Sequence, residues 1–259
     1  MNAPRQQSTY KLVVDADDQT VLSEYEPLPK DEEGYQSEAA LEDRLIEILG
    51  SQGVAHLAVK SEDALVANLR ACMERLNSIS FSDAEWDQFF KGYLSNSNEG
   101  PGEKTEKFQR NPRFSLRRDD GSTKNIDIVD KENVNNNLVQ VMNQYVPDGG
   151  SYENRYDVTV LVNGLPLVHI ELKRRGGSLR EAFNQIDRYG RESFWAGSAL
   201  FEWVQLFVIS NGTLTKYYSN TTRAAHVAKM ADSNPATRRK ASGSFKFTSY
   251  WADARNRPI

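Results

Sequence analysis

The chain has 259 residues, of which 39% are hydrophobic and 26% are charged, and these proportions are typical of a folded globular protein rather than a disordered one. It has no apolar run of about 18 residues and no signal-peptide core, so we expect neither a membrane span nor export. A single cysteine, Cys72, excludes an internal disulfide framework and, together with three histidines at no zinc-ligand spacing, predicts a cytoplasmic protein without structural zinc.

The formal net charge of −4 conceals an uneven distribution. Residues 1–100 carry a balance of −11, whereas residues 101–259 carry a balance of +7. A basic second half indicates a polyanionic partner such as nucleic acid, and a bipolar, solvated surface is the alternative.

The first part of the chain is predicted to be an arm followed by helices. Residues 1–36 are polar and acidic, and we expect them to form an irregular N-terminal arm. Helices are then predicted over 37–50, over 61–77 and from residue 82 onward, because apolar residues recur there at spacings of three and four. Residues 95–107, rich in Ser, Asn and Gly, are predicted to be a loop.

After that loop the apolar pattern changes to that of strands. A helix over 178–193 is predicted to begin at Ser178, with Glu181 completing a capping box. Strands are predicted at residues 125–129, 155–162, 167–173, 203–210 and 214–219. The pattern predicts an α/β fold with a mixed central sheet flanked by helices and an N-terminal helical elaboration.

We therefore expect one domain over 37–259 after the arm. Its helical part covers about 37–95 and its α/β core about 108–222. The remainder is predicted to be a basic tail that leads into a further part of a longer polypeptide, because the chain stops there without a terminating element.

Acidic side chains share one face of the two strands that flank Asn163-Gly164. Side chains alternate along a strand, so His169, Glu171 and Lys173 project from the same face. A hairpin loop of about three residues places Asp157 directly opposite Glu171. Two interpretations follow: Lys173 screens the acids on a solvated sheet face, or the two carboxylates hold a hard divalent cation and Lys173 acts on an attacking water.

This pattern resembles the acid, acid and lysine of the PD-(D/E)XK nuclease superfamily, with 13 residues between Asp157 and Glu171. Tyr156 stands where the motif's name has proline, a position that affects only backbone shape. The resemblance implies a restriction-endonuclease-like fold and an Mg²⁺ ion, with Mn²⁺ as a substitute. Asp157, Glu171 and the backbone carbonyl of Leu172 would be its ligands, and Lys173 would assist the water.

The predicted helix after the hairpin adds a second motif. Gln185 and Tyr189 match the Gln-x-x-x-Tyr motif of the nuclease branch that includes RecB and the R (HsdR) subunits of type I restriction enzymes, and the match implies that they orient DNA. The resemblance to the N-terminal region of R subunits covers most of residues 35–222 and is carried by residues 35–42, 154–173, 180–189 and 206–212.

The resemblance implies a type I site-specific deoxyribonuclease that cleaves double-stranded DNA. In that family an ATP-driven translocase follows the endonuclease domain, and methylation (M) and specificity (S) subunits complete the enzyme. ATP is therefore expected to act only through a translocase that this chain lacks. Two alternatives remain: a non-catalytic DNA-binding or assembly module, and a stand-alone repair or recombination nuclease.

Further candidates lie around the motif. Glu38, in the first turn of the first predicted helix, is a candidate metal ligand, or simply a charge favoured by the helix dipole. Four arginines are candidate phosphate contacts in DNA binding: Arg174, Arg175, Arg180 and Arg188.

Overall fold

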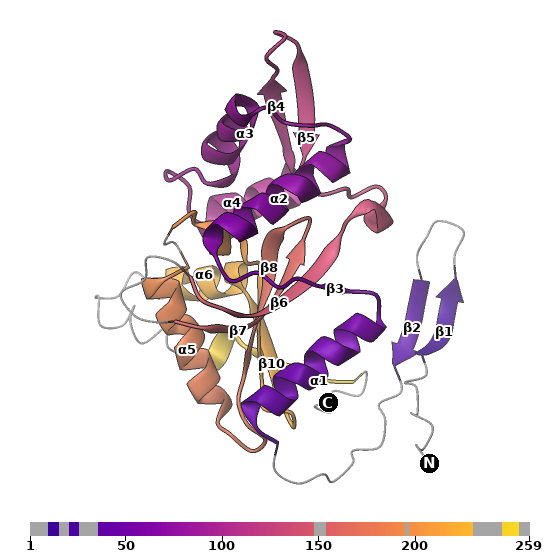
Figure 1. The fold of residues 1–259 in the computed structure, drawn as a ribbon. Coiled ribbons are helices and arrows are strands. Elements are labelled where there is room, and N and C mark those ends of the chain that lie inside the picture. Colours follow the sequence, from indigo (N-terminus) through magenta and orange to yellow (C-terminus); the bar gives the residue numbers. More distant parts are fainter. Residues whose placement is uncertain are drawn as a thin grey trace.

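A seven-stranded mixed sheet runs through the centre of the molecule (Figure 1). The computed structural model describes residues 10–15, 21–25, 36–147, 154–194, 197–229 and 245–253. The strands of the sheet are β3 (Ala55–His56), β6 (Val139–Tyr145), β7 (Tyr156–Val162), β8 (Leu165–Leu172), β9 (Leu206–Ser210), β10 (Thr215–Ser219) and β11 (Ser249–Tyr250).

The strand order is β11-β10-β9-β8-β7-β6-β3. Neighbouring strands pair antiparallel, except that β8 with β9 and β3 with β6 are parallel. This mixed sheet, flanked by helices, confirms the predicted fold class and is consistent with a restriction-endonuclease-like arrangement.

Six α-helices are described, and four of them, α1, α2, α3 and α5, begin where the sequence predicts. The helices are α1 (Glu38–Ser51), α2 (Glu62–Asn77), α3 (Asp83–Phe89), α4 (Pro101–Arg110), α5 (Leu179–Glu192) and α6 (Asn220–Lys229). Ser37, Ser61 and Ser82 cap α1, α2 and α3, each accepting a hydrogen bond from a backbone N–H three residues on. None of the helices in the described part of the chain has the length and apolar character that a membrane crossing requires.

Four short helical turns are also described. They are η1 (Phe90–Leu94), which is a π-turn continuing α3, and the 3-10 turns η2 (Val134–Asn136), η3 (Leu200–Trp203) and η4 (Phe245–Phe247).

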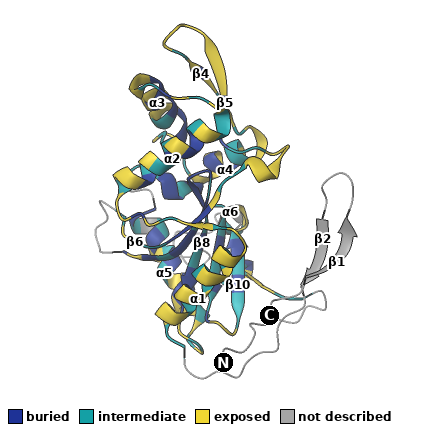
Figure 2. Cartoon of the chain, turned by 45° about the vertical axis from the view of Figure 1, so that its right-hand side comes forward, coloured by how far each residue is buried: buried dark blue, intermediate teal, exposed yellow. Residues whose placement is uncertain are grey.

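The two faces of the sheet are covered by different helices. On one face α1 packs over Val141, Val158 and Leu172. On the other face Phe183 of α5 and Ile209 of β9 belong to the larger core. Figure 2 shows the same division, with α1 exposed on its outer side and the central strands buried.

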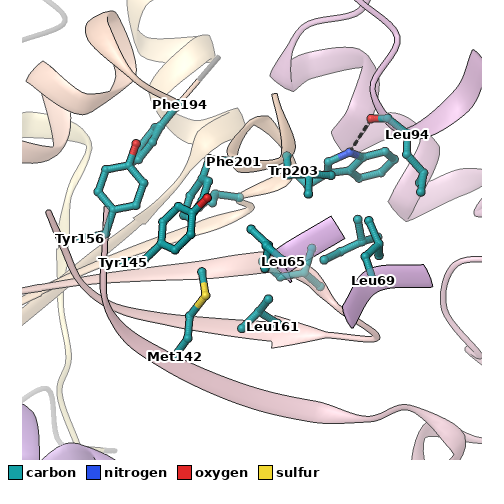
Figure 3. Close-up of a cluster of buried hydrophobic side chains, with 14 of the residues drawn as sticks. Leu65, Leu69, Leu94, Met142, Tyr145, Tyr156, Leu161, Phe194, Phe201 and Trp203 are labelled. Atoms are coloured by element: carbon teal, nitrogen blue, oxygen red, sulfur yellow. Dashed lines mark hydrogen bonds between the residues drawn. The ribbon is translucent and has the colours of Figure 1, made fainter. Parts of the chain in front are cut away.

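A helical lobe formed by α2, α3 and α4 sits above the sheet, together with the antiparallel hairpin of β4 (Arg113–Arg117) and β5 (Thr123–Asp127) (Figure 1). Trp203 joins the lobe to the sheet, because its fully buried indole N–H donates to the carbonyl of Leu94 at 2.9 Å (Figure 3). Leu65 and Leu69 of α2 lie in the same buried cluster, so one core holds both parts of the molecule.

Two expectations about local structure were wrong. Residues 1–36 are not irregular throughout, since β1 (Tyr10–Asp15) and β2 (Val21–Tyr25) form an antiparallel hairpin that contains several valines and tyrosines; apart from Gln36, the rest of that arm lies outside the described residues. The predicted loop over 95–107 contains the start of α4, where Pro101 occupies the first helical position and Glu103 accepts from the N–H of Gly100.

Two further differences concern the second half. Ser178 stands before α5 as predicted, but its side chain makes no capping hydrogen bond, so the capping box with Glu181 is not formed. The segment after residue 221 is not only a basic tail: it contributes α6 and the edge strand β11. The basic run at 238–240 lies outside the described residues.

Candidate active site

The hairpin of β7 and β8 places the acidic residues. Asn163 and Gly164, at φ values of 50° and 82°, form a two-residue turn of the kind that matches strand twist. A bulge next to Val160 adds one residue to β8, so the pairing continues with Val158 opposite Ile170. Asp157 and Glu171 are the next positions on their strands. The predicted three-residue loop is therefore a two-residue turn plus a bulge, with the same outcome for the two acids.

The helical lobe also fixes the position of this turn. A Cβ atom on Gly164 would lie 2.7 Å from the Cα of Leu69 on α2, so only glycine fits there. The helical lobe thus sets the position of the hairpin tip and, through the strand register, that of the acids at its other end.

Asp157 and Glu171 form a carboxylate pair withdrawn from water. Glu171 is completely buried and Asp157 is half-buried. Burial and, after it, the nearby charge of Glu171 together raise the pKa of Asp157 to about 7, against the backbone N–H of Leu172 that donates to Oδ2 at 2.8 Å. Burial also raises the pKa of Glu171 to about 7, although Lys173 opposes the rise. Both groups therefore ionise at a higher pH than free carboxyls do.

Lys173 supplies the only fixed cation among the contacts described for this pair. Its Nζ lies 3.4 Å from Glu171 Oε1 and donates to the carbonyl of Leu172 at 3.0 Å. Glu38, at the start of α1, approaches from the opposite side, with Oε1 3.8 Å from Lys173 Nζ. The structure thus brings together Asp157, Glu171, Lys173 and Glu38, from three different elements.

The donor set suits a hard divalent cation. Carboxylate and carbonyl oxygens from Asp157, Glu171 and Leu172 are the ligands that Mg²⁺ and Mn²⁺ prefer. Glu171 Oε2 is buried without a hydrogen-bond partner, and both carboxyls have raised pKa values that a cation would lower. Within the described residues no group of three or more His, Cys, Asp or Glu side chains could hold a metal, so the Leu172 carbonyl, water and substrate oxygens would complete the shell.

The placement of the Gln-x-x-x-Tyr pair on α5 differs from the expectation. Tyr189 is 1% exposed, and its ring packs against Tyr156, His169 and Phe194, where no DNA base could stack on it. Its hydroxyl donates to the carbonyl of Arg155 at 2.8 Å and accepts from Gln185 Nε2 at 2.5 Å. The pair therefore holds the start of β7, two residues before Asp157, and a direct contact of Tyr189 with DNA is not what this geometry favours.

The four candidate arginines divide into two kinds. Arg174 and Arg180 are exposed after β8 and at the start of α5, and Arg188, with 48% of its side chain exposed, lies 4.0 Å from Glu192. Arg175 instead donates to the side-chain oxygen of Gln36 at 2.8 Å, which ties the segment before α1 to the loop after β8. Arg175 is thus engaged within the protein, whereas Arg174 and Arg188 present charge to solvent.

Several residues beside the site were not predicted from the sequence. Gln144 of β6 has a φ of 53°. It lies opposite Asp157 of β7, between the paired positions Asn143–Val158 and Tyr145–Tyr156. Glu42, buried one helical turn after Glu38, accepts hydrogen bonds from the side chains of both Asn143 and Gln144. The sequence signal that could have found Glu42 is its spacing, because it follows Glu38 by four residues and therefore lies on the same side of the helix.

His169 is the other unpredicted neighbour. It was expected on the carboxylate face without a role, and the structure places it there, completely buried, with Nε2 3.5 Å from Glu171 Oε2. Burial lowers the pKa of His169 to about 4, so the ring is neutral. Cys72 is buried in the core.

Comparison with known proteins identifies related sequences. The family model described as "Type I restriction enzyme R protein N terminus (HSDR_N)" matches residues 35–226, a range that contains the whole candidate site. The type I restriction enzyme EcoprrI endonuclease subunit of Escherichia coli is 42% identical over 247 residues, 95% of this chain and 74% of the relative. The SsaAORF53P endonuclease subunit of Staphylococcus saprophyticus is 39% identical over 191 residues, 72% of this chain but only 20% of the relative.

Proposed function

The chain belongs to the family of type I restriction enzyme R protein N termini, and from that membership we propose that it is an endonuclease domain that hydrolyses phosphodiester bonds of double-stranded DNA with Mg²⁺. One observation carries the proposal: the buried carboxylate pair Asp157–Glu171, with Lys173 held 3.4 Å from it on the same hairpin. Burial raises the pKa of both acids, and for Asp157 the charge of Glu171 adds to that rise; such a pair is costly to the fold, which suggests a catalytic use.

Each residue of the hairpin has a distinct role in the proposed reaction. Asp157, Glu171 and the Leu172 carbonyl would hold the cation, whereas Glu38, whose described contact is with Lys173 Nζ at 3.8 Å, would orient the lysine rather than complete a three-carboxylate metal site. Bound there, Mg²⁺ would supply positive charge for the pentavalent transition state and lower the pKa of an attacking water. Lys173 Nζ would donate a hydrogen bond to that water or to a phosphate oxygen, since it already reaches both Glu171 and the Leu172 carbonyl.

The supporting residues keep this arrangement rigid. Gln185 and Tyr189 would act through the backbone of Arg155 rather than on DNA directly. Arg174, Arg180 and Arg188 would contact DNA phosphates without reading sequence.

The proposed chemistry belongs to a larger enzyme. The relatives are named as endonuclease subunits of type I restriction enzymes, and the chain spans only 20% of the staphylococcal one. We infer that this domain works in a complex with M and S subunits and that ATP acts through regions outside it.

The test is cleavage of supercoiled plasmid by the assembled enzyme with Mg²⁺ and ATP, comparing Asp157→Ala and Lys173→Ala with the unchanged protein. We expect DNA cleavage to fall by at least about 100-fold, because a cation ligand or the lysine that assists the water is removed, while ATP hydrolysis is retained because ATP acts outside this domain. Arg110→Ala is the control, since Arg110 is an exposed residue of α4 paired only with Glu106. Undiminished cleavage in both site variants would refute the proposal.

A further inference from the structure

Buried polar atoms without a hydrogen-bond partner gather on the inner side of the carboxylate pair. Among the described residues, such side-chain atoms are Thr159 Oγ1, both ring nitrogens of His169, Glu171 Oε2 and Glu192 Oε2. Thr159 and His169 are directly opposite each other on β7 and β8, and Glu171 is two residues further along β8 on the same face. Most of the unpartnered atoms therefore belong to one patch, beside the site.

His169 and Glu171 face each other within this patch. Nε2 of His169 lies 3.5 Å from Oε2 of Glu171, and both side chains are completely buried. Three aromatic rings also surround the imidazole: Tyr156, Tyr189 and Phe194 meet it edge-on at centroid distances of 5.4, 5.9 and 5.5 Å, and Thr159 is its partner across the strand pair. Glu171 Oε2 is thus the acceptor that the imidazole N–H faces.

Glu171 is held between two different groups. Its Oε1 faces Lys173 at the solvent side, and its Oε2 faces His169 at the inner side. A buried polar atom without a hydrogen bond is costly, and a neutral imidazole carries one N–H that can donate to a carboxylate. A small movement of either side chain closes the gap and satisfies both atoms.

We propose that His169 is a positioning residue for Glu171: its Nε2–H donates a hydrogen bond to Oε2 and so keeps the carboxylate oriented toward the cation. This inference rests on the proposed function, in which Glu171 is a metal ligand. Groups that hydrogen-bond a metal ligand from behind fix its orientation, and their removal typically weakens metal binding by about 10- to 100-fold. His169 would therefore act on metal affinity without touching metal or DNA.

The test is titration of the 259-residue chain with Mn²⁺ by calorimetry, together with thermal unfolding in EDTA. For His169→Leu we expect Mn²⁺ binding weaker by about 10- to 100-fold, with a cooperative metal-free unfolding transition that shows the variant is folded, because leucine fills the aromatic pocket. His169→Gln keeps an N–H donor and should restore the affinity to within about threefold. His226→Leu, the same change on α6 outside the site, should alter neither.

Three results would overturn the inference. Equal Mn²⁺ affinity in His169→Leu and the unchanged chain would refute it while leaving the proposed metal site intact. Weaker binding with a lower metal-free Tm and no rescue by glutamine would show that His169 is only a core residue. Absence of Mn²⁺ binding in the unchanged chain would remove the metal site and the inference together. If the leucine variant does not fold, His169→Asn, whose amide is too short to reach Oε2, replaces it with the same expectation.

Discussion

The two faces of the β7–β8 hairpin are built from alternate residues of the same strands, yet one face is aliphatic and the other carries buried carboxyl groups. On the α1 face, Val158 and Leu172 are buried against aliphatic side chains of the helix. On the α5 face, the neighbours of those residues, Asp157 and Glu171, are carboxyls whose pKa values burial raises to about 7. The comparison shows that one face stabilises the hairpin and the other uses part of that stability to keep two acids side by side.

The magnitudes support this division. Full burial of an aliphatic side chain contributes roughly 1.5 to 3 kcal/mol, so the apolar face can offset the cost of the polar one. A pKa shift of one unit corresponds to about 1.4 kcal/mol between protonation states, so two acids shifted by more than two units form a substantial opposing contribution.

The largest effect on stability should come from the apolar face. Val158→Ala removes two methyl groups from a completely buried position and should lower the free energy of unfolding by about 2 to 3 kcal/mol. Urea unfolding measures this. DNA cleavage by the assembled enzyme should survive at temperatures where the variant is folded.

The matched substitution on the opposite face is Thr159→Val at the next residue. It replaces a buried, unpartnered hydroxyl by a methyl group of the same shape, so stability should stay unchanged or rise by about 1 kcal/mol. Equal losses of unfolding free energy in Val158→Ala and Thr159→Val would contradict the distinction between the two faces.

The pH dependence of the metal-free chain sharpens the comparison. The pKa of Glu171 rises from 4.5 to about 7 on folding, so the folded chain binds its proton more tightly than the unfolded chain. Stability should therefore fall as pH rises above 4.5 and level off above about 7, by on the order of 3 kcal/mol for this group. Unfolding in EDTA across pH 4.5–8 should show a shallower decline for Glu171→Gln, and parallel curves would contradict the assignment.

The smallest effect should come from the exposed charges. Arg174→Ala removes an exposed cation directly after Lys173. DNA binding should weaken by about three- to tenfold, equally for all DNA sequences, and the affinity of the variant should depend less on salt concentration than that of the unchanged chain. Fluorescence anisotropy at two salt concentrations measures both. Arg110→Ala is the matched control, and an identical loss in the control would show that Arg174 has no particular position on the DNA.

The sequence was sufficient for the central hairpin because its information is local. Alternation places Asp157, Glu171 and Lys173 on strand positions that the Asn163-Gly164 turn brings together, and the packing of Leu69 on Gly164 then fixes where the hairpin lies in the fold. The serine caps of α1, α2 and α3 are equally local signals.

What the sequence did not reveal depends on distant partners. The helical spacing that groups Gln185 with Tyr189 does not say whether tyrosine faces solvent, and here its ring completes a core made with Tyr156 and Phe194. The short strands β3 and β11 exist only through pairing with β6 and β10. Likewise, the contact between His169 and Glu171 is buried because α5 covers this face of the hairpin, and strand alternation alone does not predict that cover.

The central claim, that the α5 face carries an acid pair kept for a cation at the expense of stability, is tested most directly with Asp157→Asn. The amide keeps the shape of the side chain and can still accept from the N–H of Leu172. Urea unfolding of the 259-residue chain would be measured in EDTA and again in Mn²⁺. We predict a metal-free variant about 1 to 3 kcal/mol more stable than the unchanged chain, with the stabilisation by Mn²⁺ lost. A less stable metal-free variant that Mn²⁺ still stabilises would contradict the account.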